Sequence, residues 1–447
     1  MFYRKILFRL REWANNPRRK PLVLRGARQV GKTSIVELFS QEFDIFLSVN
    51  LERKADRDIF ENNHSAEDTL TAIYLFKKKI RREGRTLLFI DEIQNSPKAV
   101  AMLRYFYEDI PDLYVIAAGS LLETMFNRHI SFPVGRVEYL ALRPCSFSEF
   151  LWASGENQLA ENLLHTNLPQ SIHYHVLKLF NEYALIGGMP EAVALYAEKR
   201  DMIALRGVYD ALLNSYGDDT EKYAANNTQV NVLRHILRYG WQYAGQRIKF
   251  ERFANSGYKS REMGEALRTM EKAMLLELSY PTVSTLLPLQ PDMNKSPKLL
   301  WLDTGLVNHA AGFQQELFGK QDISESWKGK IAEHIVGQGL LAASDMVATK
   351  RNFWVREERN SQAEIDFVIP YDNQLLPIEV KSGDNAKLKS LHLFMEKSNG
   401  NIAVRFWHQP YSADIITLPS GKKYVLHNVP FYYAECLEIF LKNMHQS

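Results

Sequence analysis

The sequence predicts a multidomain α/β protein, with a parallel sheet near the N-terminus, a helical middle and a C-terminal α+β part. Three observations predict this class. Short apolar runs alternate with longer polar helical stretches from residue 21 to about residue 150, which is typical of a parallel sheet with helices on both faces. Helical periodicity then replaces the strand signal. From residue 323 onward, strand and helix patterns mix.

Length and pattern together predict four segments. At roughly 150 residues per domain, the 447 residues correspond to about three domains. The pattern changes near residues 150, 225 and 320. We therefore expect a sheet domain over 1–150, a helical extension over 151–225, a winged-helix-like part over 226–320 and an α+β domain over 321–447.

The composition excludes several classes of protein. Hydrophobic residues make up 46% and charged residues 24%, which excludes a disordered tail or a collagen. The net charge is only +3, so global charge does not indicate nucleic-acid binding. Cys145 and Cys436 lie far apart without a CxxC motif, which excludes a zinc ribbon. Because there is no secretory signal and no apolar run longer than about half a membrane span, we expect a cytoplasmic protein without a membrane partner.

The elements of the sheet domain follow in order. Residues 1–20 predict an amphipathic helix, with Ile6, Leu10 and Trp13 at helical spacing. The apolar runs 21–24, 45–49, 87–90, 114–118 and 137–142 predict five strands. Strand 45–49 is expected to be inserted centrally, so that strands 21–24 and 87–90 are not neighbours.

A phosphate-binding loop follows the first strand in the pattern GxxxxGKT. It consists of Gly26, Ala27, Arg28, Gln29, Val30, Gly31, Lys32 and Thr33. The glycines let backbone N–H groups cradle phosphate oxygens, and the helix that begins at Ser34 adds its positive end. We expect Lys32 to reach the β- and γ-phosphates of ATP and Thr33 to bind Mg²⁺.

The strand 87–90 ends in two carboxylates, Asp91 and Glu92. Asp91 is expected to hold Mg²⁺ as a Walker B residue. Glu92 is expected to polarise the attacking water, because a base is needed one step from the metal ligand. The alternative is a strand that merely ends in solubilising acidic residues.

This layout resembles the AAA-type and STAND-type branch of P-loop ATPases. In such ATPases a polar sensor of the γ-phosphate lies where Ser120 ends the next strand; a plain turn is the alternative. Arg136 precedes the fifth strand and is expected either to sense the γ-phosphate, in cis or across subunits, or to be a surface arginine. The basic run 77–82 is expected to be a solvated helix end, with nucleic-acid phosphates as the alternative partner.

The middle of the chain predicts a winged helix. Three helices are expected at 231–239, 250–254 and 260–274, and two strands at 275–280 and 299–302. Such folds often read DNA with their third helix. Here that helix mixes basic residues such as Arg261 with acidic ones such as Glu265. The mixed charge favours an intramolecular docking module over a DNA reader.

The C-terminal part carries Asp366, a hairpin and then Glu379-Val380-Lys381. Glu379 and Lys381 share one face because the period of a strand is two. Carboxylates on adjacent strands form a hard-oxygen site for Mg²⁺ or Mn²⁺, and a lysine beside them can orient a water. The pattern resembles the PD-(D/E)xK nuclease core, and Glu333 lies where that core takes a glutamate from its first helix. The alternative is a salt bridge between Glu379 and Lys381.

Taken together, the chain resembles a widespread prokaryotic family of ATPases that join an AAA-type P-loop domain to a C-terminal domain of poorly defined function with a PD-(D/E)xK-like core. The motifs are GARQVGKT, LLFIDEIQ, VIAAGS, FPVGRVEYLALRPCSFSEF, GGMPEAV, LLWLDTGL, the helix 331–338 and AEIDFVI…PIEVKSG. The resemblance implies nucleotide binding at 26–33, Asp91 and Glu92. It implies a nuclease-like site at Glu333, Asp366, Glu379 and Lys381.

Three functions remain open from the sequence. The first is a Mg²⁺-dependent ATPase that gates a C-terminal DNA-acting domain, with ATP and DNA as partners. The second is a STAND-like regulatory switch whose C-terminal domain only binds DNA or protein. The third is a helicase-like motor, which would need homo-oligomers because the chain carries no repeated motor domain.

Overall fold

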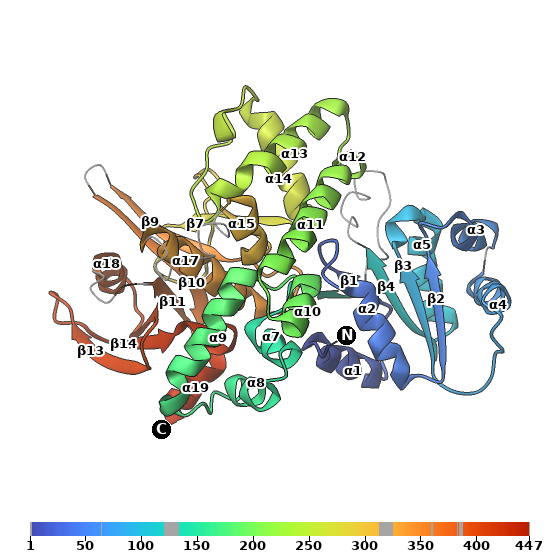
Figure 1. Cartoon of the computed structure of the whole chain (residues 1–447), viewed down its shortest axis with the longest axis horizontal. Helices are drawn as coiled ribbons and strands as arrows, with labels where there is room; N and C mark the ends of the chain where they lie inside the picture. The colour runs from blue at the N-terminus through green and yellow to red at the C-terminus, as the bar shows by residue number, and fades with distance from the viewer. Residues whose placement is uncertain are drawn as a thin grey trace. The chain divides into compact units, whose positions relative to one another are not determined.

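The structure is a computed structural model that describes residues 2–63, 65–119, 133, 135–312, 325–358, 361–381, 383 and 388–446. The chain divides into two compact units, which are described separately. Unit 1 comprises Met1–Arg143 with Lys272–Leu275 and Asp345–Ala348. Unit 2 comprises Pro144–Glu271, Leu276–Ser344 and Thr349–Ser447. Figure 1 labels their helices and strands.

Unit 1 contains a parallel sheet of five strands in the order β2-β3-β4-β1-β5. The expected strands and their parallel pairing are confirmed. Their bounds are β1 Leu22–Arg25, β2 Ile45–Asn50, β3 Thr86–Asp91, β4 Tyr114–Gly119 and β5 Glu138–Ala141.

The position expected for the second strand was wrong. As expected, β1 and β3 are not neighbours, but the strand between them is β4, and β2 lies at the sheet edge. Burial explains the difference. Strand β2 alternates buried residues with more exposed ones such as Ser48, which suits an edge. Strand β4 is buried from Val115 to Gly119, which suits the middle of the sheet.

Helices cover this sheet (Figure 1). Leu47, Leu88 and Ala117 of the sheet form one apolar core with residues of α3, α4 and α5. Ser65 and Ser96 cap α4 and α5, since their side chains accept N–H bonds from the first helical turn. The helices of unit 1 are α1 Ile6–Asn15, α2 Lys32–Phe39, α3 Lys54–Asn62, α4 Ala66–Phe76 and α5 Pro97–Asp109.

Unit 2 begins with a run of helices. They are α7 Phe147–Ala153, α8 Asn157–Leu164, α9 His173–Ile186, α10 Pro190–Lys199, α11 Arg206–Asp218, α12 Thr220–Tyr223, α13 Asn227–Tyr239 and α14 Ser260–Lys272. A buried carboxylate ties this part to later elements. Asp303, just before α15 (Thr304–Ala310), accepts hydrogen bonds from the N–H groups of Gly188 and Leu306 and from Gln338. The GGMPEAV and LLWLDTGL motifs therefore meet at one buried aspartate.

Part of the expected winged helix is present. Helices α13 and α14 form, and β6 (Leu276–Ser279) pairs with β8 (Lys298–Trp301) as an antiparallel ribbon. The second helix, expected at 250–254, is not formed. A single 3₁₀ turn, Phe253–Asn255, replaces it, because Arg252, Ala254 and Asn255 adopt positive φ. Assignment of this part as a winged helix stays a prediction.

The end of unit 2 is a mixed sheet of seven strands in the order β13-β14-β12-β11-β10-β9-β7. Strands β9, β10 and β11 are antiparallel, whereas β11, β12 and β14 run parallel. The elements of this part are β7 Pro281–Thr282, α17 Glu325–Ala342, β9 Asn352–Glu358, β10 Ser361–Tyr371, β11 Gln374–Val380, α18 Lys389–Lys397, β12 Ile402–Trp407, β13 Ser412–Thr417, β14 Lys423–Pro430 and α19 Leu437–Gln446.

No helix in the described part of the chain is long and apolar enough to span a bilayer.

Candidate functional site

The phosphate-binding loop joins β1 to α2, as the sequence predicts. The backbone of the loop lies close to the backbone of Leu142, because a Cβ at Gly26 would collide with the Leu142 carbonyl oxygen. Gly31 adopts a φ of 92°, a conformation that favours glycine, immediately before α2 begins at Lys32. The loop therefore presents its backbone at the N-terminus of α2, where an anion is stabilised.

Lys32 is buried within this loop. Its Nζ donates to the carbonyl oxygens of Gly26, at 3.0 Å, and Ala27, at 2.8 Å. Burial lowers the pKa of Lys32 to about 8, although the carboxylates of Glu92 and Asp91 oppose this. The nearby carboxylates thus do not fully offset the cost of burying the ammonium. A bound phosphate would supply further negative charge.

Thr33 and Asp91 meet across α2 and β3. Thr33 Oγ1 donates to Asp91 Oδ2 at 2.8 Å. Hydroxyl and carboxylate oxygens are the ligands that Mg²⁺ prefers. The two residues therefore fit a magnesium ion bound together with nucleotide phosphates, and they are the residues that would hold it.

Glu92 directly follows β3 in a left-handed conformation, with a φ of 52°. Its backbone N–H donates to Asp91 Oδ1 at 3.0 Å, and its carboxylate accepts a hydrogen bond from the amide of Gln94. Burial raises the pKa of Glu92. Such a carboxyl group, one residue from Asp91, is suited to accept a proton from water. Residue spacing alone did not predict a part for Gln94.

The structure does not bring Arg136 to the phosphate loop within unit 1. Arg136 forms an ion pair with Glu108 at 2.8 Å, and both side chains are solvent-accessible. It precedes β5, whose first residue, Glu138, pairs with Leu22 at the start of β1, whereas the loop follows the end of β1. The expectation that Arg136 acts in cis finds no support here, and action across subunits stays a prediction. Ser120 lies outside the described residues.

The basic run at 77–82 follows the end of α4. Lys77 pairs with the buried Asp56 at 2.9 Å, and Arg81 pairs with Glu67 at 2.7 Å. Two of its cations therefore have internal carboxylate partners, which favours the interpretation of this run as a helix end.

In unit 2, the expected C-terminal residues lie on adjacent elements. The antiparallel register that pairs Phe367 with Ile378 puts Asp366 opposite Glu379. Lys381 Nζ lies 2.5 Å from Glu379 Oε1, and Asp366 Oδ2 accepts the N–H of Val380 at 2.8 Å. The salt bridge that the sequence left as an alternative is therefore formed.

Sequence reasoning missed a second lysine, Lys298 of β8. Its Nζ lies 2.7 Å from Glu333 Oε1 of α17 and 2.7 Å from Glu364 Oε1 of β10. The Lys298 side chain is only 3% exposed. Glu364 shares a strand face with Asp366, because the two are two positions apart in the strand. A lysine inside the apolar strand sequence KLLW was the available signal.

Burial and like charge raise the carboxyl pKa values in this cluster. Burial, followed by the charge of Asp366, raises the pKa of Glu379 to about 8. Burial also raises the pKa of Glu333 to about 7, although Lys298 opposes this. Burial would lower the pKa of Lys298, but the surrounding carboxylates outweigh it and raise that pKa. The lysine is therefore held in its charged form.

The predicted metal ligands Glu333, Asp366 and Glu379 do not form a metal site in this structure. Among the described residues, no group of three or more His, Cys, Asp or Glu side chains is placed to hold a metal ion. The ammonium of Lys298 lies on Glu333 instead. The chemistry of this donor set is that of an ion-pair network, so the residues present do not fit the metal that the nuclease resemblance implies.

Comparisons with known proteins agree with the N-terminal geometry. A family model described as an AAA domain matches residues 18–151. Two family models for domains of unknown function match residues 177–317 and 328–423. No curated protein matches the chain significantly.

Solved structures are similar to the chain only at a distance. A Walker-type ATPase of Pyrococcus abyssi is 15% identical, with a TM-score of 0.41 over 70% of this chain and 96% of that one. A STAND protein of Pyrococcus horikoshii with a tetratricopeptide repeat sensor is 13% identical, with a TM-score of 0.28 over 77% and 47% of the two chains. The Thermotoga maritima RuvB motor is 17% identical, with a TM-score of 0.27 over 62% and 90%. Likenesses this weak carry no argument about function.

The N-terminal domain is therefore an AAA-type P-loop ATPase domain. The matched region contains the phosphate loop, Asp91 and Glu92, and all five strands of the parallel sheet. Domains of this type use a nucleotide, usually with Mg²⁺. The two later regions match families whose functions are undefined, so the nuclease-like resemblance of the C-terminal part has no support from these families.

Proposed function

We propose that this protein is a Mg²⁺-dependent ATPase whose nucleotide state controls a C-terminal domain that binds DNA or protein, in the manner of a STAND-like switch. The observation that carries the ATPase part is the contact between Thr33 and Asp91, with Glu92 one residue away. The observation that favours binding over cutting is Lys298 lying on Glu333 and Glu364.

Each residue of the loop has a distinct part in the proposed hydrolysis. The backbone of 26–31 and the ammonium of Lys32 bind phosphate oxygens and offset their charge. Thr33 and Asp91 hold Mg²⁺, which supplies charge stabilisation for phosphoryl transfer when bound. Glu92 accepts a hydrogen bond from the attacking water and takes its proton. Gln94 orients the Glu92 carboxylate.

Two variants test the ATPase part. Lys32→Ala should abolish measurable binding of Mg·ATP, because the phosphates lose their cation. Glu92→Gln should keep nucleotide affinity but lower the turnover rate by about 10²- to 10⁴-fold, the range for losing a general base. Calorimetry and phosphate release measure the two quantities. Unchanged turnover in Glu92→Gln would contradict the assignment of the base.

A nuclease is the second candidate function. Asp366 opposite Glu379, with Lys381 at 2.5 Å, supports it, as does the buried Oε2 of Glu379, which has no hydrogen-bond partner among the described residues. The test is cleavage of single- and double-stranded DNA with Mg²⁺ or Mn²⁺, with and without ATP. Cutting that is lost in Asp366→Ala and Lys381→Ala would replace the switch proposal with a nuclease. Absence of cutting with ATPase activity intact is the result that we expect.

A further inference from the structure

We infer that Lys298 is the resident cation at Glu333 and Glu364 in the C-terminal carboxylate cluster, beside the ion pair of Lys381 with Glu379. By carboxylate cluster we mean Glu333, Glu364, Asp366 and Glu379. The ammonium of Lys298 holds the position at Glu333 that a divalent cation would need, and the cluster binds such a cation only when this ammonium is removed. This inference goes beyond the proposed function, because it concerns the cluster whether or not ATP is hydrolysed.

Lys298 contacts two carboxylates of the cluster directly. Lys298 Nζ lies at 2.7 Å from one oxygen of Glu333 and at 2.7 Å from one oxygen of Glu364, which are hydrogen-bond distances between charged groups. The side chains of Lys298 and Glu333 are 3% and 19% exposed. The ammonium between the two carboxylates offsets part of their negative charge, and it would repel a metal ion at Glu333 at close range.

Lys298 and the carboxylates come from different parts of the chain. Glu364, Asp366 and Glu379 lie on β10 and β11, and Glu333 lies on α17, all within the C-terminal part of unit 2. Lys298 comes instead from the earlier β6–β8 ribbon. A segment outside the mixed sheet therefore supplies the cation of a cluster that the sheet builds.

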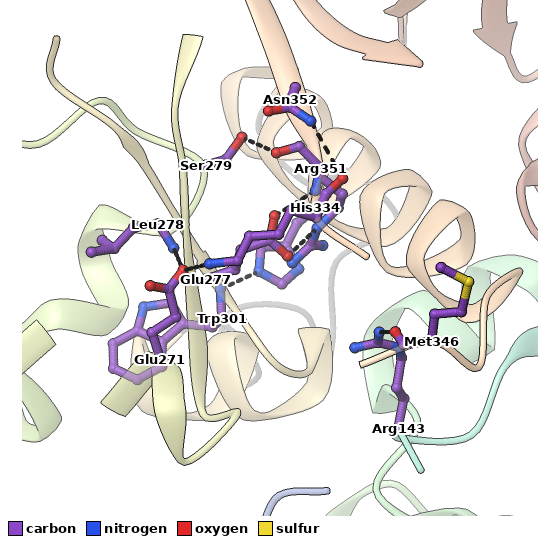
Figure 2. A network of polar contacts seen from close by, with 11 residues as sticks. Arg143, Glu271, Glu277, Leu278, Ser279, Trp301, His334, Met346, Arg351 and Asn352 are labelled. Carbon is purple, nitrogen blue, oxygen red and sulfur yellow. Dashed lines mark hydrogen bonds and ion pairs between the residues drawn. The ribbon is translucent and has the colours of Figure 1, made fainter. Parts of the chain in front are cut away.

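Contacts with Arg351 and His334 hold the β6–β8 ribbon in place, and Figure 2 shows them. Glu277 of β6 forms a buried ion pair with Arg351 at 3.2 Å and also accepts the backbone N–H of Arg351. The backbone N–H of Trp301, in β8, donates to His334 Nε2 at 3.1 Å, and His334 is adjacent to Glu333. The strand that carries Lys298 is thus fixed to α17 through its last residue, Trp301, and His334.

A second contact holds the other strand of the ribbon, opposite Lys298. Ser279 Oγ donates to the carbonyl oxygen of Arg351 at 2.7 Å, and Ser279 pairs with Lys298 across the ribbon. Because both strands of the ribbon are held, the backbone of Lys298 stays beside the cluster while the ribbon is in place, and the ion pairs with Glu333 and Glu364 hold its ammonium. Removing its charge should therefore create a metal-binding site that the unchanged chain lacks.

The experiment is a titration of the full chain with Mn²⁺ in the absence of nucleotide, followed by calorimetry and by thermal unfolding. The unchanged chain should show no binding that Asp366→Asn removes. Lys298→Met should gain a Mn²⁺ site at least about tenfold tighter than any site of the unchanged chain, because it leaves the largely buried carboxylate of Glu333 without its cation. Its unfolding temperature should rise with Mn²⁺. Lys249→Met, an exposed lysine of unit 2, is the matched control and should gain nothing.

Two results would overturn the inference. One is Mn²⁺ binding by the unchanged chain that Asp366→Asn abolishes. The other is a folded Lys298→Met chain that binds no more Mn²⁺ than the control. Titration of the unchanged chain tests the inference even where Lys298→Met does not fold, and Lys298→Gln offers a second variant. Failure of the proposed ATPase would appear in Glu92→Gln turnover and would leave these Mn²⁺ results unchanged.

Discussion

At the scale of single residues, the charged groups of both sites lie where burial works against their charge. Burial lowers the pKa of Lys32 and raises the pKa of Glu92 and Glu379. The two sites differ in what offsets this. In the phosphate loop the missing countercharge is that of a nucleotide phosphate, whereas in the carboxylate cluster it is supplied by lysines of the same chain.

Glu379 leads to a prediction about stability and pH. Its pKa of about 8 in the folded chain lies above the ordinary glutamate value, so the folded state binds more protons between these two values. The contribution of Glu379 to stability should therefore be greatest below the ordinary glutamate pKa and fall as pH rises toward 8. Glu379→Gln should flatten this slope in urea unfolding followed by tryptophan fluorescence. Glu438→Gln, at an exposed position on α19, should keep the slope of the unchanged chain.

His334 leads to the opposite dependence. Burial, with a contribution from Arg351, lowers its pKa to about 3, so the ring stays neutral and accepts the N–H of Trp301. The unfolded chain takes up a proton as pH falls below the ordinary histidine value, and the folded chain does not. The contribution of His334 to stability should therefore be lost from about pH 6.5 down to pH 3, and the fall in stability over this range should be less steep in His334→Gln. Equal slopes in His334→Gln and in the exposed control His175→Gln would contradict this.

Most residues of the two candidate sites could be predicted from the sequence, whereas Lys298 could not. The eight residues of the phosphate loop, Asp91 and Glu92 follow from local spacing, because one strand end and one helix start bring them together. Lys298 could not be found that way. It precedes Glu333 by 35 positions, and only the pairing of β6 with β8 and their packing on α17 bring it to the cluster.

At the scale of elements, the β6–β8 ribbon is the part whose anchoring has measurable consequences. The ion pair of Glu277 and Arg351 is buried on both sides, with side chains 10% and 6% exposed. Removing one partner leaves the other charge buried without compensation. The ribbon should therefore be sensitive to single substitutions at this pair and much less sensitive to a matched replacement of both.

A double-mutant cycle tests this expectation. Glu277→Ala should lower the free energy of unfolding by about 3 kcal/mol, the low end for breaking a buried ion pair. The double variant Glu277→Leu/Arg351→Met should be destabilised by less than the sum of its single variants. The exposed pair of Arg261 and Glu265 is the control, and Glu265→Ala should change stability by less than about 1 kcal/mol. Additive effects at the buried pair would contradict the prediction.

Element identity was easier to predict than element order. The five strands of unit 1 were found from apolar runs, but the pattern could not tell which strand is central. Both β2 and β4 are short and apolar, and only their burial in the sheet separates the edge from the middle. Likewise, the expected helix at 250–254 gave way to positive-φ residues, which helical periodicity does not detect.

At the scale of the whole molecule, the chain passes between its two units five times, after residues 143, 271, 275, 344 and 348. Unit 1 contains the nucleotide site, and unit 2 contains the carboxylate cluster. Several covalent connections give a nucleotide-dependent change more than one route into unit 2. The proposed switch requires that nucleotide binding in unit 1 alters the affinity of unit 2 for its ligand.

Reciprocal coupling between ATP and DNA is the prediction that follows for the full chain. If Mg·ATP changes the Kd for a labelled DNA duplex, DNA must change the Kd for ATP by the same factor, because the binding free energies around a closed cycle sum to zero. We expect a factor in the range of about 5 to 150, as is usual for coupled sites. Fluorescence anisotropy and calorimetry on the same preparation give the two factors. In Lys32→Ala, ATP should no longer change DNA affinity, whereas DNA affinity without ATP should persist. Tight DNA binding that ATP leaves unchanged would exclude control of DNA binding by the nucleotide and would direct the test to a protein ligand of unit 2.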